Sequence, residues 1–446
     1  MKIRRLLAVW TSKIIGTACR LTGRQGVTLA GQLAIRIYPG ILKELSQEVR
    51  EKIFVVCGTN GKTTTNNLLC SAIEAEGKKV VCNHTGSNMI NGVVSAFVLS
   101  TKLNGKLDAD YACIEIDEAS TVRILPHFAP DYMVLTNLFR DQLDRYGEID
   151  ITMDLLRKAM DMAPEMTVIV NGDDSLSAYL AMESNNDYRT YGIGGQVIEE
   201  EDTREIREGQ FCKRCGEKLS YHFYHYSQLG DYECPNCGFK RPPLDFDAKN
   251  IEVGSRLSFE IEGKRISAGY RGFYNVYNIL AAYAACRCAG MEVKNFQKML
   301  DEFNPQNGRM ENFRIGDTDV ILNLAKNPAG FNQNISAVIQ DESLKDLIIV
   351  INDNDQDGID ISWLWDVDFD RFKDANVNSI TVSGLRCQDM RLRLKYVDIP
   401  SRLDSSVEGA IRERLENGIG NLYVLVNYTA LFSTRNVLKK MEEEKI

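Results

Sequence analysis

KIFVVCGTNGKTTTNNLL, residues 52–69, is the stretch of the chain that decides the fold. Its first six residues are mostly apolar, with β-branched and aromatic side chains, which predicts a short buried strand at 52–57. A helical pattern follows at 66–77, and the segment 58–65 between them contains two glycines. Backbone N–H groups at the start of a helix point toward an anion, and glycine lets the backbone approach it closely. The stretch therefore predicts a phosphate-binding loop.

Two side chains of this loop carry the expected chemistry. Lys62 would neutralise the β- and γ-phosphates of a nucleotide, and the Thr63 hydroxyl would be a magnesium ligand. The usual consensus has four residues between its glycines and this loop has two, so it is a shorter variant. The predicted nucleotide-binding residues of the loop are Gly58, Thr59, Asn60, Gly61, Lys62, Thr63 and Thr64.

Outward from the loop, short apolar strands alternate with helices, which is typical of stacked βαβ units around a parallel sheet. We expect strands at 79–83, 111–116, 132–136 and 167–170, and helices at 91–101, 149–162 and 276–289. Later strands at 320–324 and 347–351, and near residues 380 and 422, indicate a second, Rossmann-like α/β domain. The expected organisation is an N-terminal helical arm (1–50), a central P-loop domain (51–312) and a C-terminal α/β domain (313–446).

Composition excludes several classes of protein. Of the 446 residues, 44% are hydrophobic and 26% are charged, which rules out a disordered, collagen-like or multi-span membrane protein. The net charge is −9, so we expect no broad nucleic-acid-binding surface. Of the 12 cysteines, eight are scattered along the chain, which is typical of a reducing compartment and predicts a cytoplasmic protein.

The other four cysteines form two knuckles. The pairs Cys212-x-x-Cys215 and Cys234-x-x-Cys237 enclose 18 residues, the spacing of a Cys₄ zinc ribbon inserted at 205–245. Four thiolates close the coordination sphere, so the predicted zinc is structural. His222 and His225 lie inside the enclosed stretch and are alternative ligands; a cluster that binds no metal is the other alternative.

The N-terminal arm has a charge of its own. Its first 43 residues contain eight basic residues and no acidic ones. Apolar side chains recur among them at helical spacing: Leu6, Leu7, Trp10, Ile14, Ile15 and Ala18. Lys13 interrupts the apolar run, which argues against a signal peptide. A basic amphipathic helix can lie on an anionic membrane, here the inner face of a bacterial membrane, whereas an ordinary helix would pack on the protein body; the pattern fits either.

The loop GTNGKTT resembles the ATP loop of the Mur ligases and their folylpolyglutamate synthetase relatives. Further segments resemble that family in the same order: YACIEIDEAS (111–120), TNLFRDQLDRYG (136–147), NGDD (171–174), GFYNVYN (272–278) and GRME (308–311). The resemblance implies ATP and Mg²⁺, with magnesium on Glu115 and Thr63, although Glu118 is an alternative to Glu115. It also implies that Asn278 meets the adenine nucleotide and that Arg309 reaches phosphate.

The chain departs from the family at two places. A histidine of the family's magnesium site is Gln142 here. Whether this chain has a second magnesium site is therefore left open by the sequence. The family's D-Y-A-H-N-P segment is NLAKNP (323–328), without its aspartate and histidine. No lysine of this sequence is matched to the carbamylated lysine found in several Mur ligases.

The ribbon and the segment NDNDQDGIDISWLWDVDF (352–369) resemble the MurT family, the ligase subunits of lipid II isoglutaminyl synthase. In that family a Mur ligase-like subunit forms a heterodimer with GatD, a class I-type glutaminase. Together they amidate the α-carboxylate of D-isoglutamate in lipid II. The resemblance implies that Lys62 and Glu115 act in the ligase reaction, and that Asp360 orients the partner's catalytic histidine.

The acidic loop has competing interpretations. Asp353, Asp355, Asp357 and Gly358 match positions 1, 3, 5 and 6 of an EF-hand, but position 12 is Leu364 instead of glutamate. A solvated acidic loop is a second alternative. Spacing does not separate Asp360 from the other aspartates; the resemblance does.

Two rival functions stay open for the whole chain. One is a free-standing Mur-type ligase that adds an amino acid, and the other is a zinc-ribbon ATPase that binds nucleic acid through a locally basic ribbon.

Overall fold

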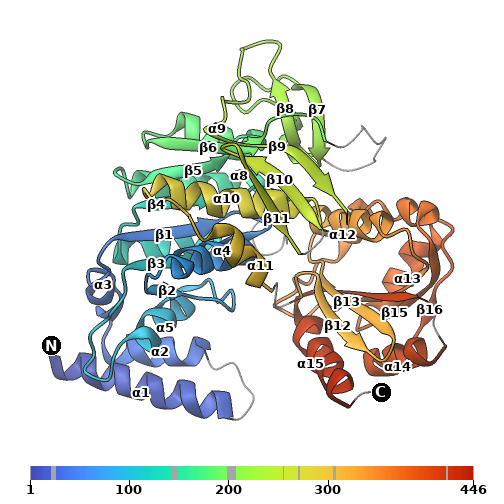
Figure 1. The fold of residues 1–446 in the computed structure, drawn as a ribbon, viewed down its shortest axis with the longest axis horizontal. Helices are drawn as coiled ribbons and strands as arrows, with labels where there is room; N and C mark the ends of the chain where they lie inside the picture. The colour runs from blue at the N-terminus through green and yellow to red at the C-terminus, as the bar shows by residue number, and fades with distance from the viewer. Residues whose placement is uncertain are drawn as a thin grey trace.

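The computed structural model describes residues 2–21, 27–141, 148–197, 207–254, 256–269, 272–304, 308–417 and 420–444. Gln142, on which the question of a second magnesium site depends, lies outside these residues. Figure 1 shows two α/β bodies side by side, with an N-terminal helical arm at the lower left and a small hairpin at the top.

The larger sheet has nine strands in the order β11-β10-β9-β6-β5-β4-β1-β3-β2. From β2 to β9 all neighbouring strands are parallel, as the alternation of strands and helices predicted. The strands are β1 (Lys52–Cys57), β2 (Val80–Cys82), β3 (Tyr111–Glu115), β4 (Tyr132–Leu135), β5 (Thr167–Asn171), β6 (Tyr188–Ile193), β9 (Phe246–Val253), β10 (Leu257–Ile261) and β11 (Lys264–Ala268).

The antiparallel extension formed by β9, β10 and β11 was not predicted. Its signal was present in the sequence, because apolar and polar residues alternate along β10 (LSFEI, 257–261), and the apolar ones are buried. The turn between β10 and β11 is Glu262-Gly263, with φ of 47° and 73°. Two residues with positive φ form the tight turn that joins hairpin strands, so this segment had the pattern of a hairpin.

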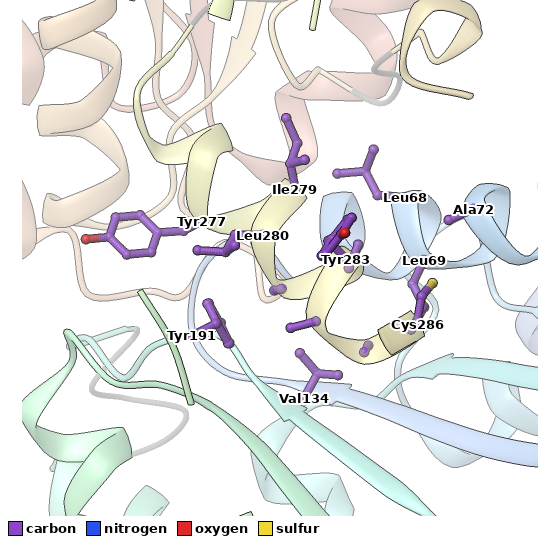
Figure 2. Packing of buried hydrophobic residues seen from close by; sticks show 14 of the residues in the cluster. Leu68, Leu69, Ala72, Val134, Tyr191, Tyr277, Ile279, Leu280, Tyr283 and Cys286 are labelled. Carbon is purple, nitrogen blue, oxygen red and sulfur yellow. The ribbon is translucent and has the colours of Figure 1, made fainter. Parts of the chain in front are cut away.

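Strand β1 is buried because helices cover both faces of the sheet. Phe54 and Val56 join one apolar cluster with α4 (Lys62–Ala75) and α10 (Tyr274–Cys288), whose packing Figure 2 shows. Ile53 and Val55 join the cluster on the opposite face. The helices of that second face are α5 (Ile90–Ser100), α6 (Thr121–Ile124), α8 (Ile149–Asp161) and α9 (Ser175–Glu183); α11 (Phe296–Glu302) lies near β11 and α4. The nearly continuous apolar run of β1 follows from this arrangement.

The N-terminal arm consists of α1 (Lys2–Leu21), α2 (Val27–Ile37) and α3 (Ile41–Ser46). Helix α1 contacts α2 and α5 and buries Ala8 and Val9. The apolar residues of α1 are therefore divided between two faces, and Ile3, Leu7, Trp10 and Ile14 stay exposed. Among the described residues, no helix combines the length and the apolar character needed to cross a bilayer.

The second sheet has six strands in the order β12-β13-β17-β14-β15-β16, all parallel except β12. They are β12 (Glu311–Ile315), β13 (Thr318–Leu324), β14 (Lys345–Val350), β15 (Val377–Ser383), β16 (Arg402–Leu403) and β17 (Asn421–Val426). One face packs on α12 (Pro328–Gln340) and α13 (Cys387–Lys395), the other on α14 (Val407–Asn417) and α15 (Tyr428–Glu444). This confirms the second α/β fold; the domain limits given above stay predictions.

Candidate functional site: a nucleotide cleft and an acidic loop

The phosphate-binding loop follows β1 directly and needs both of its glycines. Gly58 has a φ of 117° and Gly61 a φ of 84°, values that side chains disfavour. A Cβ atom on Gly58 would lie 2.3 Å from Thr136 Oγ1, and one on Gly61 would lie 2.2 Å from Asn278 Oδ1. The glycines thus let the loop pack between the end of β4 and helix α10.

Lys62 is the first residue of α4, and its ammonium group is buried among loop and acidic atoms. The Nζ atom donates to the Thr59 carbonyl at 3.2 Å and lies 3.0 Å from Glu118 Oε1. Burial lowers the pKa of Lys62, but the charges of Glu118 and Glu115 outweigh burial and raise the pKa above its usual value. The loop therefore holds a permanent cation at the N-terminus of a helix, where phosphate oxygens would bind.

Glu115 ends β3 beside the loop. Its Oε1 accepts a hydrogen bond from Asn88 Nδ2 at 3.1 Å, whereas Oε2 is buried and has no hydrogen-bond partner among the described residues. A Cβ built on Gly86 would lie 3.1 Å from Thr63 Oγ1 and 3.3 Å from Glu115 Oε2, so both oxygens face the same small space. A carboxylate and a hydroxyl oxygen are suitable ligands for Mg²⁺.

Glu118 differs from Glu115 in its surroundings. It begins the short 3₁₀ turn Glu118–Ser120 and forms the ion pair with Lys62. The sequence left the two glutamates as alternatives for the magnesium site. Their surroundings differ: one carboxylate is paired with a lysine, and the other has an oxygen beside Thr63 that no described residue contacts by a hydrogen bond.

A cleft opens from the loop toward the C-terminal domain, with about 610 Å³ of space not filled by protein. Its lining includes Asn60, Gly61, Asn278 and Arg309. Asn278 Oδ1 accepts from Thr65 Oγ1 at 3.3 Å. Arg309 Nε is shielded from solvent without a partner among the described residues, and burial lowers the pKa of its guanidinium. A shielded cation facing a cleft is suited to an anionic ligand.

Several residues at the cleft were not predicted as site residues. Asn137 Oδ1 accepts from the Asn60 amide at 2.9 Å, and Asn327 Nδ2 donates to Asn60 Oδ1 at 3.1 Å. Asn327 also caps α12, because its Oδ1 accepts from the Gly330 amide at 2.8 Å. Asn followed by Pro is a helix-start signal that could have identified it. Beside Asn327, Lys326 pairs with Asp141. Residues 326–327 of the C-terminal domain therefore contact the central domain at the phosphate-binding loop and near it.

The acidic loop follows β14 in the C-terminal domain, and its carboxylates do not converge on one point. Asp357 is buried and its Oδ1 accepts from the Thr429 amide at 2.8 Å, whereas Asp353 lies 3.4 Å from Arg386 Nη1. Asp360 Oδ1 accepts from the Ser362 amide at 2.8 Å, which lowers the pKa of Asp360. Among the described residues these carboxylates form no metal-ligand group, so the EF-hand alternative finds no support.

Asp360 lies between an exposed apolar surface and the interface of the two domains. On one side is a hollow lined by Ile359, Trp365 and Leu392, all exposed. On the other side, Asp360 lines a second pocket together with Arg140 and Asn327. The apolar surface consists of Ile359, Trp365, Leu392 and Tyr396, and we call it the Asp360 face.

The four predicted zinc ligands meet beside the hairpin of β7 (Ser220–Tyr226) and β8 (Leu229–Glu233), at the top of Figure 1. Their sulfur atoms lie within 4.8 Å of one another, and the contacts Cys212–Cys237 and Cys215–Cys234 are both 3.5 Å. Tetrahedral zinc with Zn–S bonds of about 2.3 Å places sulfurs about 3.8 Å apart, so the thiols fit this ion.

The histidines of the ribbon do not join this cluster. His225 is buried, its ring lies 5.5 Å from that of Phe273, and burial lowers its pKa to about 3. The described group of metal-ligating atoms at the ribbon contains the four cysteines and neither His222 nor His225.

Much of the ribbon's positive charge is paired with acidic groups of the chain. The paired residues include Lys213 with Asp150 (2.6 Å), Arg214 with Glu183 (2.6 Å) and Arg241 with Asp173 (3.2 Å). This pairing weakens the nucleic-acid alternative, which needs basic side chains available for phosphate.

Comparisons with known proteins agree with this geometry. The Mur ligase middle domain model matches residues 56–286, and the MurT ligase C-terminal model matches residues 324–431. The chain is 34% identical over 431 residues to the lipid II isoglutaminyl synthase (glutamine-hydrolyzing) subunit MurT of Staphylococcus aureus (strain COL), covering 96% of both chains. The MurT subunit of Streptococcus pneumoniae (strain ATCC BAA-255 / R6) is 34% identical, over 93% of this chain and 92% of that one.

A solved structure shares the fold. The pseudomurein peptide ligase type C from Methanothermus fervidus superposes with a TM-score of 0.69 at 24% identity, covering 89% of this chain and 80% of the other. The Mur ligase family uses ATP and Mg²⁺, and the donor set at Lys62, Thr63 and Glu115 is chemically suited to both. By its P-loop cleft, its acidic loop and its relatives, the chain belongs to the MurT family of Mur ligases.

Proposed function

We propose that the chain is the ligase subunit of a glutamine-dependent amidotransferase that converts the D-isoglutamate α-carboxylate of lipid II into the amide at the expense of ATP. One observation carries this proposal. The chain has a nucleotide cleft and, beside it, a carboxylate loop, yet it contains no histidine after His225. A glutaminase needs a Cys–His pair, and no histidine is among the described residues that line the two pockets containing Asp360, which supports a role for Asp360 in orienting a histidine of another subunit.

The ligase reaction has two steps. The substrate carboxylate attacks the γ-phosphorus of ATP, the bond to the β–γ bridging oxygen breaks, and an acyl phosphate and ADP form. Ammonia then attacks the acyl carbon, phosphate leaves, and the nitrogen loses a proton to give the amide. Bound Mg²⁺ supplies charge neutralisation on the phosphate oxygens.

The chain's own residues bind and orient the reactants. Lys62 and the loop amides would hold the β- and γ-phosphates, Thr63 and Glu115 would be the magnesium ligands, and Arg309, which lines the cleft, would reach a phosphate oxygen. Asn278 would lie against the nucleotide. Because little covalent chemistry falls to the protein, positioning and positive charge supply most of the acceleration.

The test is reconstitution with different nitrogen sources. Purified chain, ATP, Mg²⁺ and a lipid II-type stem peptide should yield amide with high ammonium chloride, and with glutamine only when a glutaminase subunit is added. Lys298→Ala, on an exposed part of α11, serves as the surface control. ATP turnover that requires an amino acid as the amine would overturn the proposal in favour of the free-standing ligase.

The partner we propose is a GatD-like class I glutaminase, bound at the Asp360 face to form a heterodimer. Exposed aromatic and aliphatic residues around one carboxylate are typical of an interface core. Trp365 is the strongest anchor, because its ring packs edge-on against that of Tyr396 at 5.1 Å and both remain exposed. Trp365→Glu should abolish co-purification with the glutaminase while ammonium-dependent synthesis persists. If the variant still co-purifies with the glutaminase, the partner binds at another surface.

We also propose that the four ribbon cysteines bind one structural zinc. Metal binding and folding are coupled in such modules, so Cys215→Ser or Cys237→Ser should release the metal and unfold the ribbon. Both side chains are exposed, so neither substitution creates a cavity in the core. Freshly purified, unchelated protein that contains no zinc would contradict this assignment.

The arm is proposed to contact an anionic membrane, where a lipid-linked substrate is located. Ile3, Leu7, Trp10 and Ile14 are 75%, 49%, 47% and 69% exposed and recur at helical spacing along α1. Leu103, to whose carbonyl Trp10 Nε1 donates at 2.8 Å, extends the same apolar surface. The basic character of the arm favours anionic lipid over a second copy of this chain.

Vesicle flotation tests the membrane contact. The full chain should float with phosphatidylglycerol vesicles and not with phosphatidylcholine vesicles, and Ile3→Glu combined with Ile14→Glu should weaken binding about tenfold. Met162→Glu, at an exposed apolar residue on another part of the surface, is the matched control. Equal flotation of wild type and double variant would exclude α1 as the membrane surface.

A further inference from the structure

A second group of metal-ligating side chains lies away from the ribbon. Cys70 comes from α4, Cys82 ends β2, and His84 follows two residues later. One ligand atom of each lies within 4.8 Å of the others, and Cys70 Sγ is 3.9 Å from His84 Nε2. Zinc with bonds of about 2.3 Å to sulfur and about 2.0 Å to nitrogen would place these atoms about 3.6 Å apart. The Cys70–His84 separation is therefore about 0.3 Å longer than in such a site, and all three ligand atoms already lie within 4.8 Å of one another.

Neighbouring amides orient these ligands. His84 Nδ1 lies 3.3 Å from Asn67 Oδ1, and Asn67 Nδ2 donates to the His84 carbonyl at 3.2 Å. With Nδ1 held in this way, Nε2 is directed toward Cys70. Asn66 Nδ2 lies 3.3 Å from Cys82 Sγ and donates to it, which helps to fix the position of that sulfur. Outer partners of this kind are characteristic of protein metal sites.

We propose that Cys70, Cys82 and His84 bind a soft divalent cation, at a site separate from the ribbon and from the proposed magnesium site. Zn²⁺ is the cation used to test this site. Two thiolates and one imidazole match the preference of Zn²⁺ for sulfur and nitrogen ligands. A water molecule would complete a tetrahedron on the exposed side, where His84 reaches the surface. Each thiol loses its proton to solvent when the cation binds.

The site would act on the nucleotide cleft through the segment 83–88. Asn83 Oδ1 accepts from the Glu115 amide and Asn83 Nδ2 donates to the Glu115 carbonyl, both at 2.8 Å. Asn88, at the other end of the segment, binds Glu115 Oε1. A cation held by Cys82 and His84 would therefore restrain the segment that orients the proposed magnesium glutamate.

Metal counting on the full-length chain tests the site. Wild type, refilled with excess Zn²⁺ under reducing conditions and desalted, should hold one zinc more than His84→Gln and one more than Cys82→Ala. His84 is exposed, so its replacement should leave the fold intact, and the ribbon's zinc should be retained in both variants. His127→Gln is the matched control and should bind as much zinc as wild type. Equal zinc in wild type and His84→Gln would overturn the proposal.

Two further measurements separate the metal site from its alternatives. Zn²⁺ should protect Cys70 and Cys82 from alkylation in wild type and much less in His84→Gln. Recovery of Cys70 and Cys82 as a disulfide from anaerobically purified protein would overturn the assignment, because the pair would then be a redox couple.

His84→Gln should also raise the Mg²⁺ concentration needed for half-maximal ATP binding about tenfold. Because zinc content is independent of amidation, the test stands whether or not the proposed function holds.

Discussion

The nucleotide cleft and the acidic loop both contain carboxylates, but they differ in what surrounds them. At the cleft, Glu118 is paired with the buried Lys62, whereas one oxygen of Glu115, beside Thr63, has no hydrogen-bond partner in the part of the chain that the structure describes. At the loop, Asp360 accepts one backbone hydrogen bond and lies beside exposed apolar side chains. The first arrangement brings together cation, hydroxyl and carboxylate within one chain. The second has a carboxylate and an exposed apolar surface, and the role that we propose for Asp360 needs another molecule.

This contrast predicts which substitutions lower the amidation rate with both nitrogen sources and which lower it only with glutamine. Lys62→Ala should have the largest effect, because it removes the cation that neutralises the transferring phosphoryl group. We expect a loss of about 10³–10⁵-fold in amidation, equally with ammonium chloride and with glutamine plus partner. Initial rates of ADP release measure it. Activity within twofold of wild type would remove the P-loop from the mechanism.

Asp360→Asn should separate the two sites. The amide no longer stabilises a partner's imidazolium, so glutamine-dependent synthesis should fall on the order of 10³-fold or more, whereas ammonium-dependent synthesis should survive. Asp355→Asn, in the exposed part of the same loop, is the matched control and should leave both rates unchanged. Equal loss with both nitrogen sources would place Asp360 in the ligase site or in the fold.

Glu115→Gln should sharpen the distinction between the two glutamates of the cleft. Loss of one carboxylate charge at the proposed magnesium site should lower kcat about 10²-fold and raise the magnesium requirement. Glu118→Gln should instead release Lys62, with a smaller effect on the magnesium requirement. Magnesium titration of ATP turnover distinguishes them; a larger magnesium shift in the Glu118 variant would reverse the assignment.

The smallest predicted effect concerns pH and lies outside both sites. His225 is buried with a pKa of about 3, below its value of about 6.5 in an unfolded chain. Its contribution to stability is therefore complete above about pH 6.5 and is lost as the pH falls toward 3. At pH 5 the ring stays neutral in the folded protein but is protonated in the unfolded chain. The contribution of His225 to the free energy of unfolding should therefore be about 2 kcal/mol lower at pH 5 than at pH 7.5.

His225→Phe removes this titration while keeping an aromatic ring against Phe273. The difference in stability between variant and wild type should grow by that amount between pH 7.5 and pH 5, measured by urea unfolding. A difference that does not change with pH would mean that His225 is not buried in its neutral form.

The cleft could be predicted from the sequence further than the acidic loop. The loop at 58–64 was predicted from its own residues, and Glu115, Asn278 and Arg309 from their resemblance to Mur ligase motifs; the structure places all of them around one opening or beside it. In the acidic loop, spacing alone does not distinguish Asp360 from Asp353, Asp355 and Asp357. What distinguishes them is tertiary: Thr429 binds Asp357 and Arg386 pairs with Asp353, from segments remote in the sequence.

The sequence by itself determined the α/β class, the phosphate loop, the four-cysteine ribbon and the second α/β domain, because periodicity and motif spacing are local properties of the chain. Tertiary structure decided which glutamate pairs with Lys62, how α1 divides its apolar residues between two faces, and how Asn327 links the domains at the phosphate loop. It also brought Cys70 next to Cys82 and His84. These outcomes depend on contacts between residues distant in sequence, whose partners are set only when helices and strands pack.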